Sequence, residues 1–417
     1  MSKEVFVHID LKGKTYFAGR LWIHNVRGRE SASFEYSPEW LSFPARFSLE
    51  PSLLVGEGTF HTEKALFGSI GDSAPDRWGR LLMGRREARA AKSQKRVPRK
   101  LYESDFLLMV NDRARQGSLR FSERMGGPYL APETDTPIPP LVKLERLLSA
   151  SHRILSQKEF DEDIRELVDP GASIGGARPK ASVLDHNGNL LIAKFPSHHD
   201  DWDVVSWEFL SLQMAKRAGL SVPEVRLAKV LGKNVLLLER FDRNNRVNRI
   251  PFLSAMSMLE ASDGDHGSYL ELGEIILQHG SSPREDLVNL WKRMVFNIMI
   301  SNVDDHLRNH GFLYEGTSGW KLSPVYDLEP TPTYIKPRIL HTRIDLYDGT
   351  ASLELAYEVA PEFGIDARAA RKIAGEVGMA VKDWRKDAAR LGIGKEEIER
   401  MNSAFDHSDL RKSLNGR

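Results

Sequence analysis

Residues 301–330 read "SNVDDHLRNHGFLYEGTSGWKLSPVYDLEP", and the interpretation of this stretch decides the fold. Acidic residues, histidines and asparagines gather here, directly after a strongly apolar segment with the spacing of a helix. Three interpretations are open: a solvated loop, the site of a metal-dependent hydrolase, or a place where a nucleotide phosphate meets magnesium. The residues elsewhere in the chain have to decide between them.

Composition limits the possible classes of protein. The chain has 417 residues, more than the roughly 250 to 300 at which single cores stop growing, so two or more subdomains are expected. Hydrophobic residues make up 41% of the chain, enough for a large core. Lysine and arginine number 59 against 58 acidic residues, so no global charge excess attracts nucleic acid or an anionic membrane. Such binding would need a local patch.

The chain contains no cysteine, which excludes disulfides, thiolate nucleophiles and cysteine-ligated zinc or iron. The opening residues, "MSKEVFVHIDLKGKTY", lack the apolar core of a signal peptide. No uncharged apolar run is long enough to predict a membrane span. We therefore expect a soluble cytoplasmic protein.

Changes in composition along the chain predict four parts. Residues 1–125 form a mixed unit, with the β-like runs "EVFVHID" and "TYFAGRLWI" followed by helical segments. Residues 126–140, "GGPYLAPETDTPIPP", hold two glycines and five prolines, which is typical of an extended linker. Residues 141–242 begin with an amphipathic helix and become rich in β-structure, and residues 243–417 are mostly helical, with charged helices at the end. We find no internal repeat.

A glycine-rich loop opens the β-rich part, in "DPGASIGGARPKASVLDHNGNLLIAKFPS" at 169–197. A strand, an Asn187-Gly188 turn and a second strand that carries Lys194 follow the loop, and Asn-Gly between apolar runs predicts a hairpin. Glycines allow several backbone N–H groups to approach a phosphate, but they also simply form turns. A Walker A loop is excluded, because no Gly-Lys-Ser/Thr follows. The glycines in question are Gly171, Gly175 and Gly176.

The next segments place two further candidate residues. "DVVSWEFLSLQMAKRAGL" predicts a helix that ends at Gly219 and carries Glu208, fourteen positions after Lys194. Protein kinases pair a strand lysine with a helix glutamate to hold the α and β phosphates. "EVRLAKVLGKNVLLLERFDR" then predicts a strand, a turn and a second strand. The end of the second strand carries Glu239 and Phe241, at the place where a kinase-like lobe has the hinge that meets adenine. An ordinary strand edge with a surface charge is the alternative.

Three residues predict the start of the helix before residues 301–330. Ser282 would be the cap, Pro283 takes the first helical position, and Glu285 takes the capping-box position. This helix delivers Asp304 to a loop. Asn309 follows five positions later, as in the kinase pattern H-R-D-x-x-x-x-N. A hairpin-like segment then ends at Asp327, where a D-F-G aspartate would bind metal.

The residue types suit phosphoryl transfer, because it needs a carboxylate near the acceptor hydroxyl and oxygen ligands for Mg²⁺. Asp304 would serve the hydroxyl, while Asn309 and Asp327 would bind the cation. A zinc or iron site is the competing interpretation, although H-E-x-x-H is absent. The residues of that site would be Asp304, Asp305, His306 and His310. A plain polar loop, with Asp304 as a cap and His306 as a core imidazole, also remains open.

Five motifs together resemble the HipA family, the kinase toxins of bacterial toxin–antitoxin pairs: "SIGGARPKA", "LIAKFPS", "LLLERFDR", "NVDDHLRNHGF" and "LSPVYDL". The resemblance covers essentially the full chain. It implies an α+β, two-lobed kinase-like fold with an N-terminal mixed subdomain and a helical C-terminal lobe. It also implies ATP and Mg²⁺ as cofactors, and serine/threonine protein kinase activity.

The resemblance also implies a biological setting. The family's best-known type of substrate is an aminoacyl-tRNA synthetase, glutamyl-tRNA synthetase in particular, whose phosphorylation stalls translation and produces growth arrest or drug tolerance. The partner would be a small HipB-like helix-turn-helix antitoxin, which binds operator DNA. A catalytically silent ATP-binding subunit that acts as a corepressor with the antitoxin is the alternative, from a different class of function.

The family motifs assign roles to residues. Lys194 would bind the ATP phosphates, and Asp304 would be the catalytic aspartate. The rest of the expected ATP site consists of Gly175, Gly176, Glu208 and the hinge residues Glu239 and Phe241, and the Mg²⁺ ligands would be Asn309 and Asp327. Asp305 and His306 are expected to shape the catalytic loop without contacting phosphate.

Ser173 matches the serine that the family autophosphorylates in its glycine-rich loop. A phosphoserine carries about −1.5 to −2 charges near neutral pH, so placed beside the ATP phosphates it should expel the loop and shut the site. Ser173 is therefore a hypothetical off-switch. A turn serine that bonds to nearby backbone is the alternative.

Several features of eukaryotic kinases are missing: G-x-G-x-x-G, H-R-D, D-F-G and A-P-E. Regulation by a conventional activation loop is therefore not assumed. "GDSAPDRWGR" at 71–80 indicates a capped helix entry without chemistry of its own. The following stretch, "GRREARAAKSQKRVPRK", gathers basic residues, and it is either a solvated, mobile face or a patch that meets DNA or an acidic partner. The basic residues are Arg85, Arg86, Arg89, Lys92, Lys95, Arg96, Arg99 and Lys100.

Overall fold

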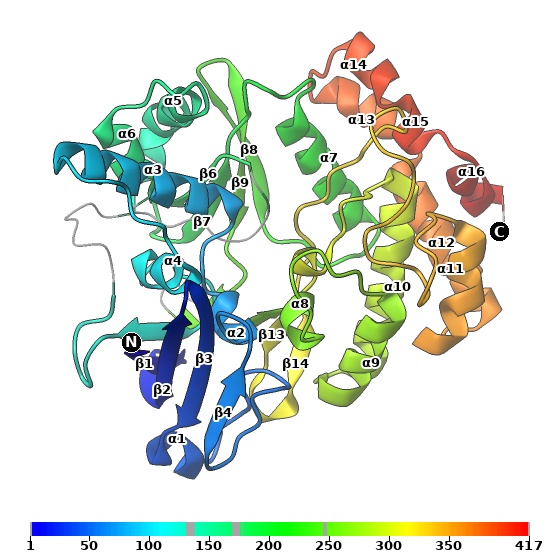
Figure 1. Cartoon of the computed structure of the whole chain (residues 1–417). Helices are drawn as coiled ribbons and strands as arrows, with labels where there is room; N and C mark the ends of the chain where they lie inside the picture. The colour runs from blue at the N-terminus through cyan, green and yellow to red at the C-terminus, as the bar shows by residue number, and fades with distance from the viewer. Residues whose placement is uncertain (1, 131–137, 169–175, 177, 245–247, 416–417) are drawn as a thin grey trace. The chain divides into compact units, whose positions relative to one another are not determined.

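The computed structural model describes residues 2–130, 138–168, 176, 178–244 and 248–415. The chain divides into two compact units, each built from two stretches of sequence (Figure 1). The first unit comprises Met1–His199 and Ala228–Leu253, and the second comprises Asp200–Leu227 and Ser254–Arg417. The four-part segmentation expected from composition stays a prediction. Strands and helices are mixed throughout, which confirms the expected α+β class.

A five-stranded antiparallel sheet opens the first unit, with strand order β4-β3-β2-β1-β5. The predicted strands at "EVFVHID" and "TYFAGRLWI" are confirmed as parts of β1 and β2. Alternate apolar residues such as Val5, Val7 and Ile9 are buried in the core of this sheet. The strands are β1 (Ser2–Leu11), β2 (Lys14–Val26), β3 (Arg29–Tyr36), β4 (Thr59–Thr62) and β5 (Leu119–Ser122). The helices of this part are α1 (Pro38–Ser42), α2 (Gly68–Gly71), α3 (Arg77–Ser93) and α4 (Glu103–Met109).

A second sheet has the order β6-β7-β9-β8. The predicted hairpin is confirmed: Gly188 has φ +81°, and the Asp185 carboxylate accepts from the N–H groups of Asn187 and Asn189, both at 2.8 Å. A helical layer of α3, α5 and α6 supplies apolar side chains to the same core (Figure 1). The elements are α5 (Leu144–Leu155), α6 (Asp161–Val168), β6 (Lys180–Leu184), β7 (Leu190–Lys194), β8 (Val225–Val230) and β9 (Lys233–Glu239).

Helix α10 (Pro283–Ile300) is the central helix of the second unit, and it contacts α9, α11 and α12. Twelve of its residues are buried, Trp291 and Met294 among them, because apolar positions recur all along it. The predicted helix end at Gly219 is confirmed, since α7 closes there with a glycine at φ +77°. The other main elements are α7 (Val204–Arg217), α9 (Tyr269–His279), the hairpin β13 (Gly311–Tyr314) and β14 (Trp320–Leu322), α11 (Leu353–Val359), α12 (Ala367–Val381), α13 (Trp384–Arg390), α14 (Lys395–Arg400) and α16 (Ser408–Asn415).

The capping box predicted at the start of α10 is wrong. Pro283 does occupy the first helical turn, but the Ser282 side chain makes no capping hydrogen bond. The ψ of Ser282 is 63°, far from the extended backbone that directs a cap hydroxyl at the N–H of the first turn. Helix α9 does have a capping box, because Ser268 and Glu271 there exchange both hydrogen bonds.

Among the described residues, no helix has the length and apolar character needed to cross a membrane.

Candidate nucleotide and metal site

Lys194 is the last residue of β7 and is only 3% exposed. Its neighbours in the ladders are Lys180 on β6 and Leu236 on β9. The strand is buried along its whole length, so Lys194 does not lie on a solvated face. A buried ammonium group is stable only when anionic or hydrogen-bonding groups surround it, and this is the environment that an ATP-phosphate lysine requires.

The expected hinge follows β9 in the first unit. Glu239 closes the strand opposite Leu191, and the Arg240 N–H donates to the Leu190 carbonyl at 3.0 Å. The Phe241 ring lies 6.3 Å from that of Phe252. Glu239 and Phe241 are half-buried, and their role toward adenine stays a prediction.

The glycine-rich loop is described at one glycine. The Gly176 carbonyl accepts a hydrogen bond from Lys180 Nζ at 2.7 Å. Gly171, Ser173 and Gly175 lie outside the described residues. Their roles, including the switch at Ser173, stay predictions.

The second unit contains the expected catalytic loop. Helix α10 ends at Ile300, and Ser301 at φ +51° turns the chain out of the helix, so Asp304 does lie in a loop as predicted. Arg338 holds this turn by donating to Ser301 Oγ and to the Ile298 carbonyl, both at 3.0 Å. Asp304 itself is exposed, and its Oδ1 accepts from Lys336 Nζ at 3.2 Å. A carboxylate presented in this way is able to meet an acceptor hydroxyl.

Asn309 has the orientation that a metal ligand needs. Its Nδ2 donates to the Asp304 carbonyl at 2.9 Å, which fixes the amide plane. Its Oδ1 is buried and has no hydrogen-bond partner in the described part of the chain. Leaving a buried acceptor unpaired costs about 1–3 kcal/mol, and a bound cation would remove that cost. The amide oxygen is also a ligand type that Mg²⁺ accepts.

Three carboxylates gather in the second unit. Oxygens of Glu208, Asp327 and Glu329 lie within 4.8 Å of one another. Glu208 on α7 is 1% exposed, and Asp327 has φ +58°, an unusual backbone conformation for a residue with a side chain. Carboxylate oxygens gathered at this distance are of the type that a hard divalent ion takes as ligands.

This grouping concerns two residues beyond Asp327. The expected role of Glu208 toward the ATP phosphates stays a prediction, and within its own unit Glu208 lies beside Asp327. Glu329 was missed altogether. Its signal was its place two positions after Asp327 in "YDLEP", but a single further carboxylate in a loop does not stand out in a sequence.

Asp305 shapes the loop as expected. Its carboxylate is buried and accepts from Tyr269 Oη at 2.7 Å and from the His341 N–H at 2.8 Å, while its carbonyl accepts from Thr342 Oγ1 at 2.6 Å. Burial raises the pKa of Asp305 to about 7, although these hydrogen bonds oppose the rise. The segment around residue 341 is thereby attached to the catalytic loop.

The histidine-based metal centre gains no support. Buried His310 directs Nε2 at the Asp305 carbonyl, 3.2 Å away, and burial lowers the pKa of His310 to about 3. Within the described ranges, Glu208, Asp327 and Glu329 form the one group of three or more possible ligands close enough to share an ion. Asp304, Asp305, His306 and His310 do not form such a group.

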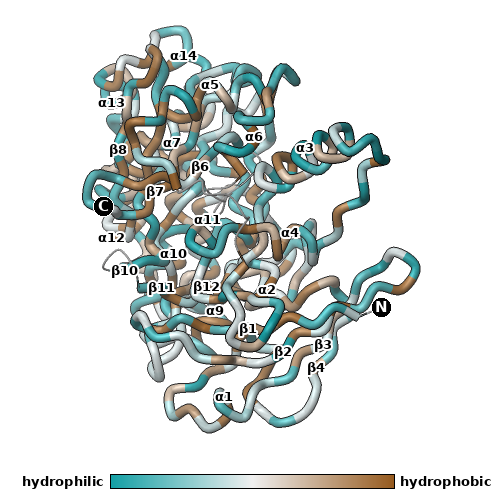
Figure 2. Tube along the Cα trace, turned by 90° about the vertical axis from the view of Figure 1, so that its left-hand side faces the viewer, coloured by the Kyte–Doolittle hydropathy of each residue, from teal (hydrophilic) through white to brown (hydrophobic). Residues whose placement is uncertain are grey.

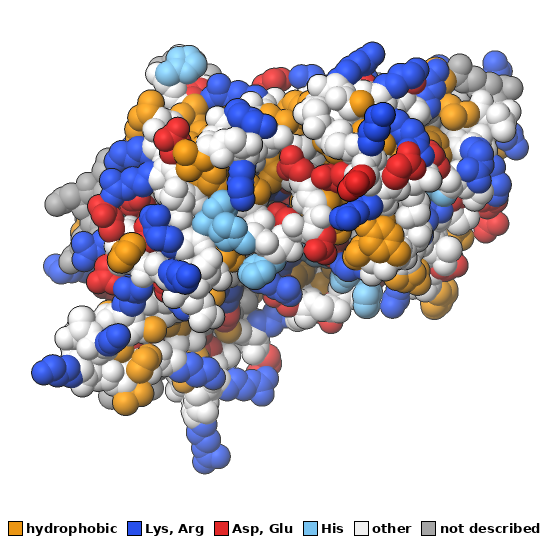
Figure 3. Space-filling model, turned by 90° about the horizontal axis from the view of Figure 1, so that it is seen from above, with side chains coloured by type: hydrophobic (Ala, Val, Ile, Leu, Met, Phe, Trp, Pro, Cys, Tyr) orange, Lys and Arg blue, Asp and Glu red, His pale blue; other side chains and the backbone are white. Residues whose placement is uncertain are grey.

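Acidic partners accompany much of the basic stretch at 84–100. Arg89 pairs with Asp161 at 2.7 Å, and Arg99 pairs with Asp105 at 2.8 Å. Arg96 pairs with Glu87 and holds the pKa of Glu87 down at about 2. The first part of the stretch is the ordered helix α3, and the polar segment after it is drawn mostly in teal in Figure 2. Basic and acidic side chains are also interspersed over the face in Figure 3. This local neutralisation weakens the interpretation as a DNA-binding patch.

The fold and the catalytic loop define a protein of the kinase-like class. The chain belongs to the family described as HipA-like C-terminal domain, whose model matches residues 172–384, half of the chain. The match includes Gly175, Gly176, Lys194, the expected catalytic loop and Asp327.

Two relatives illustrate the family at the sequence level. A putative kinase of Haemophilus influenzae is 24% identical over 242 residues, which cover 49% of this chain and 69% of that protein. The serine/threonine-protein kinase toxin HipA of Shewanella oneidensis is 24% identical over 197 residues, covering 40% of this chain and 44% of the relative. Several curated relatives are matched over about half of their length or less.

A solved structure extends the likeness to the whole chain. The Shewanella oneidensis HipA chain, from a complex with HipB and operator DNA, aligns with a TM-score of 0.66 at 16% identity. The alignment covers 99% of this chain and 96% of that one. The two-lobed kinase-like fold expected from the sequence is thereby confirmed.

Proposed function

We propose that the protein is an ATP- and Mg²⁺-dependent serine/threonine protein kinase and the toxin of a toxin–antitoxin pair. One observation carries the proposal. Asn309 donates its amide to the Asp304 backbone and keeps a buried, unpaired oxygen, five residues after an exposed carboxylate. This arrangement supplies a positioning carboxylate and a cation ligand on one short loop, as phosphoryl transfer requires.

Each residue then has a role in the transfer. The hinge at Glu239 and Phe241 receives adenine, while Gly175, Gly176 and Lys194 receive the phosphates. Asp304 would orient the acceptor hydroxyl and take up its proton as the oxygen bonds to the γ-phosphorus, while the bond from that phosphorus to the β–γ bridging oxygen breaks and ADP leaves. Asn309 and Asp327 would hold Mg²⁺, and the bound ion would supply positive charge near the phosphate oxygens. Glu208 would either serve the ATP phosphates, as the family motifs imply, or join Asp327 and Glu329 around the cation.

The proposed substrate is a translation component, with an aminoacyl-tRNA synthetase, and glutamyl-tRNA synthetase first, as the candidate. Its phosphorylation would arrest growth, and we propose a cytoplasmic location for the protein. A HipB-like antitoxin is the proposed partner, which the HipB and operator DNA in the Shewanella oneidensis complex support. Phosphorylation of Ser173 would shut the site through the charge of the phosphate.

Mass spectrometry of the purified protein after incubation with Mg-ATP tests the proposal. The wild type should gain phosphate at Ser173, Asp304→Ala should gain none, and the surface control Asp383→Ala should match the wild type. ATP binding without phosphate in any of the three would favour the silent corepressor instead. If the wild type does not bind ATP at all, any kinase function is contradicted. Glutamyl-tRNA synthetase added to the same reaction tests the substrate.

A further inference from the structure

The N-terminal segment, residues 2–125, contacts the expected nucleotide-binding elements at two places within the first unit. The first place is the segment after β9. Asp242 is fully buried, and its carboxylate accepts from the Gly117 N–H at 2.8 Å, from Arg240 Nε at 2.6 Å and from an Arg243 Nη at 2.8 Å. Burial pushes the pKa of Asp242 upward, but Arg240 and Arg243 hold it well below its ordinary value, so the carboxylate stays charged.

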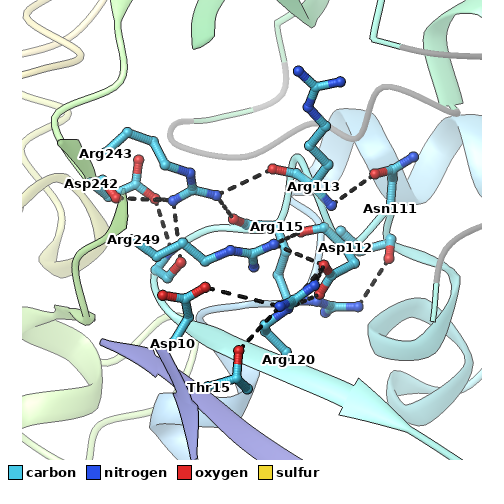
Figure 4. A network of polar contacts seen from close by, with 12 residues as sticks. Asp10, Thr15, Asn111, Asp112, Arg113, Arg115, Arg120, Asp242, Arg243 and Arg249 are labelled. Atoms are coloured by element: carbon cyan, nitrogen blue, oxygen red, sulfur yellow. Dashed lines mark hydrogen bonds and ion pairs between the residues drawn. The ribbon is translucent and has the colours of Figure 1, made fainter. Parts of the chain in front are cut away.

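The two arginines extend this contact back to the N-terminal segment. Arg240 donates to the Ala114 carbonyl at 3.0 Å, and Arg243 donates to the Arg115 carbonyl at 2.5 Å. Behind them, Asp112 joins Arg249, after the hinge, to Arg120 of β5 at 2.8 and 2.7 Å (Figure 4). The hinge is therefore attached to the loop at 112–117 by buried, charge-assisted hydrogen bonds, the stronger kind.

The second place is the exit of the glycine-rich loop. Lys180 is 1% exposed, and its Nζ donates to Asp76 Oδ2 at 2.6 Å and to the Gly176 carbonyl at 2.7 Å. The Trp78 indole N–H donates to the Lys180 carbonyl at 3.0 Å. Asp76 also caps α3 through its other oxygen, which accepts from the Gly79 N–H at 2.9 Å. The motif "GDSAPDRWGR" thus holds a lysine that reaches the last glycine of the loop.

The position of Lys180 makes Asp76 important for Lys194. The two lysines are direct cross-strand partners on β6 and β7. Like charges placed opposite each other destabilise a sheet. The Asp76 carboxylate offsets this repulsion from the Lys180 side. Asp76 therefore affects both the loop and the strand that carries Lys194.

We propose that the N-terminal segment positions both ends of the nucleotide site, with Asp242 setting the hinge for the adenine and Asp76 setting Gly176 and Lys194 for the phosphates. The proposal rests on the proposed ATP-binding function. Both aspartates are positioning residues, because neither is expected to touch the nucleotide. The two roles separate by ligand: adenosine uses the hinge alone, whereas ATP uses the hinge and the phosphate elements.

The experiment measures the affinities of the full chain for adenosine and for Mg-ATP by calorimetry. The variants are Asp76→Asn and Asp242→Asn, which keep the side-chain shape and remove the charge. Asp163→Asn is the matched control, because Asp163 is a 4% exposed carboxylate of the same unit that accepts from Arg153 Nε and from the Phe160 N–H, both at 2.8 Å. If Asp242→Asn fails to fold, Arg243→Lys takes its place. This variant keeps the positive charge at residue 243 but loses the several N–H donors of the guanidinium group.

Asp76→Asn should weaken Mg-ATP binding by about tenfold or more and leave adenosine binding unchanged. Asp242→Asn should weaken both ligands by the same factor, and Asp163→Asn should change neither. Unchanged affinities in both aspartate variants would overturn the proposal. So would equal losses for both ligands in Asp76→Asn, or losses matched by Asp163→Asn, because these would reflect general destabilisation.

A second readout needs no nucleotide. Amide hydrogen exchange at residues 178–184 should speed up in Asp76→Asn, and exchange at 239–244 should speed up in Asp242→Asn, each relative to Asp163→Asn. Absence of these local changes would overturn the positioning roles. If the wild type binds no nucleotide but the exchange changes occur, the proposed function fails, while the structural roles of Asp76 and Asp242 are supported.

Discussion

Replacement of Asp305 by asparagine should change how the stability of the protein depends on pH. Asp305 is fully buried, and its pKa is raised from the ordinary 3.8 to about 7. Between these values the native state holds a proton that the unfolded state has released. The contribution of Asp305 to stability therefore falls as pH rises from about 4 to about 7, by at most about 1.4 kcal/mol per pH unit, and does not change further above pH 7. The total effect of the carboxylate is roughly 4 kcal/mol.

The substitution removes this dependence. The new asparagine side chain would have no charge to bury. Its amide nitrogen would, however, stand where a carboxylate oxygen accepts from Tyr269, and loss of this hydrogen bond would cost about 1–3 kcal/mol of stability. We expect the variant to be less stable than the wild type at pH 5 and to equal or exceed it at pH 8. Urea denaturation of both proteins at pH 5, 6, 7 and 8 measures the difference.

Asp304→Asn is the control for this prediction, because Asp304 is the neighbouring carboxylate and is exposed. Its pH profile should parallel that of the wild type. The reasoning is refuted if the profiles of Asp305→Asn and the wild type are parallel between pH 5 and 7.

Three further predictions concern individual residues. Asn309→Ala should lower phosphoryl transfer by at least about a hundredfold in a labelled-ATP assay, since it removes the proposed metal ligand and a fixed loop contact; an active variant would exclude the ligand role. Glu329→Gln should raise the Mg²⁺ concentration needed for half-maximal activity several-fold, because it removes one of three clustered carboxylates, and an unchanged Mg²⁺ titration would exclude Glu329 from the cation site. Gly188→Ala should lower stability by about 1 kcal/mol in thermal denaturation, because the turn requires φ +81° and only glycine adopts it without cost; a stability equal to the wild type would show that the turn relaxes.

Local patterns made the scaffold predictable. The Asn187-Gly188 hairpin and the helix ending at Gly219 follow from residues that are adjacent in sequence. The place of Asp304 after an apolar helix follows in the same way. Each of these features is set by backbone preferences and periodicity within one segment, and these are what a sequence displays.

Contacts between distant segments were not predictable. Glu208 and Glu329 come together only through the fold of the second unit, and the partner of Arg89 lies in another helix. Asp242 is the centre of a buried ionic network, and its partners at 112–117 are far from it in the sequence. The failed cap at Ser282 has the same origin, because its backbone angles are set by the surrounding chain and not by the residue type.

The rate of γ-phosphate transfer from labelled ATP to protein serine or threonine tests the central claim most directly. The comparison is between the wild type, Asp304→Asn and Asp263→Asn. Asp263 is an exposed aspartate that pairs with Arg308, which lies on the same loop as Asp304. Mg²⁺-dependent transfer by the wild type and by Asp263→Asn, with none by Asp304→Asn, is the predicted result. Equal transfer by all three proteins, or none by any of them, would contradict the assignment of Asp304 as the catalytic residue of a kinase.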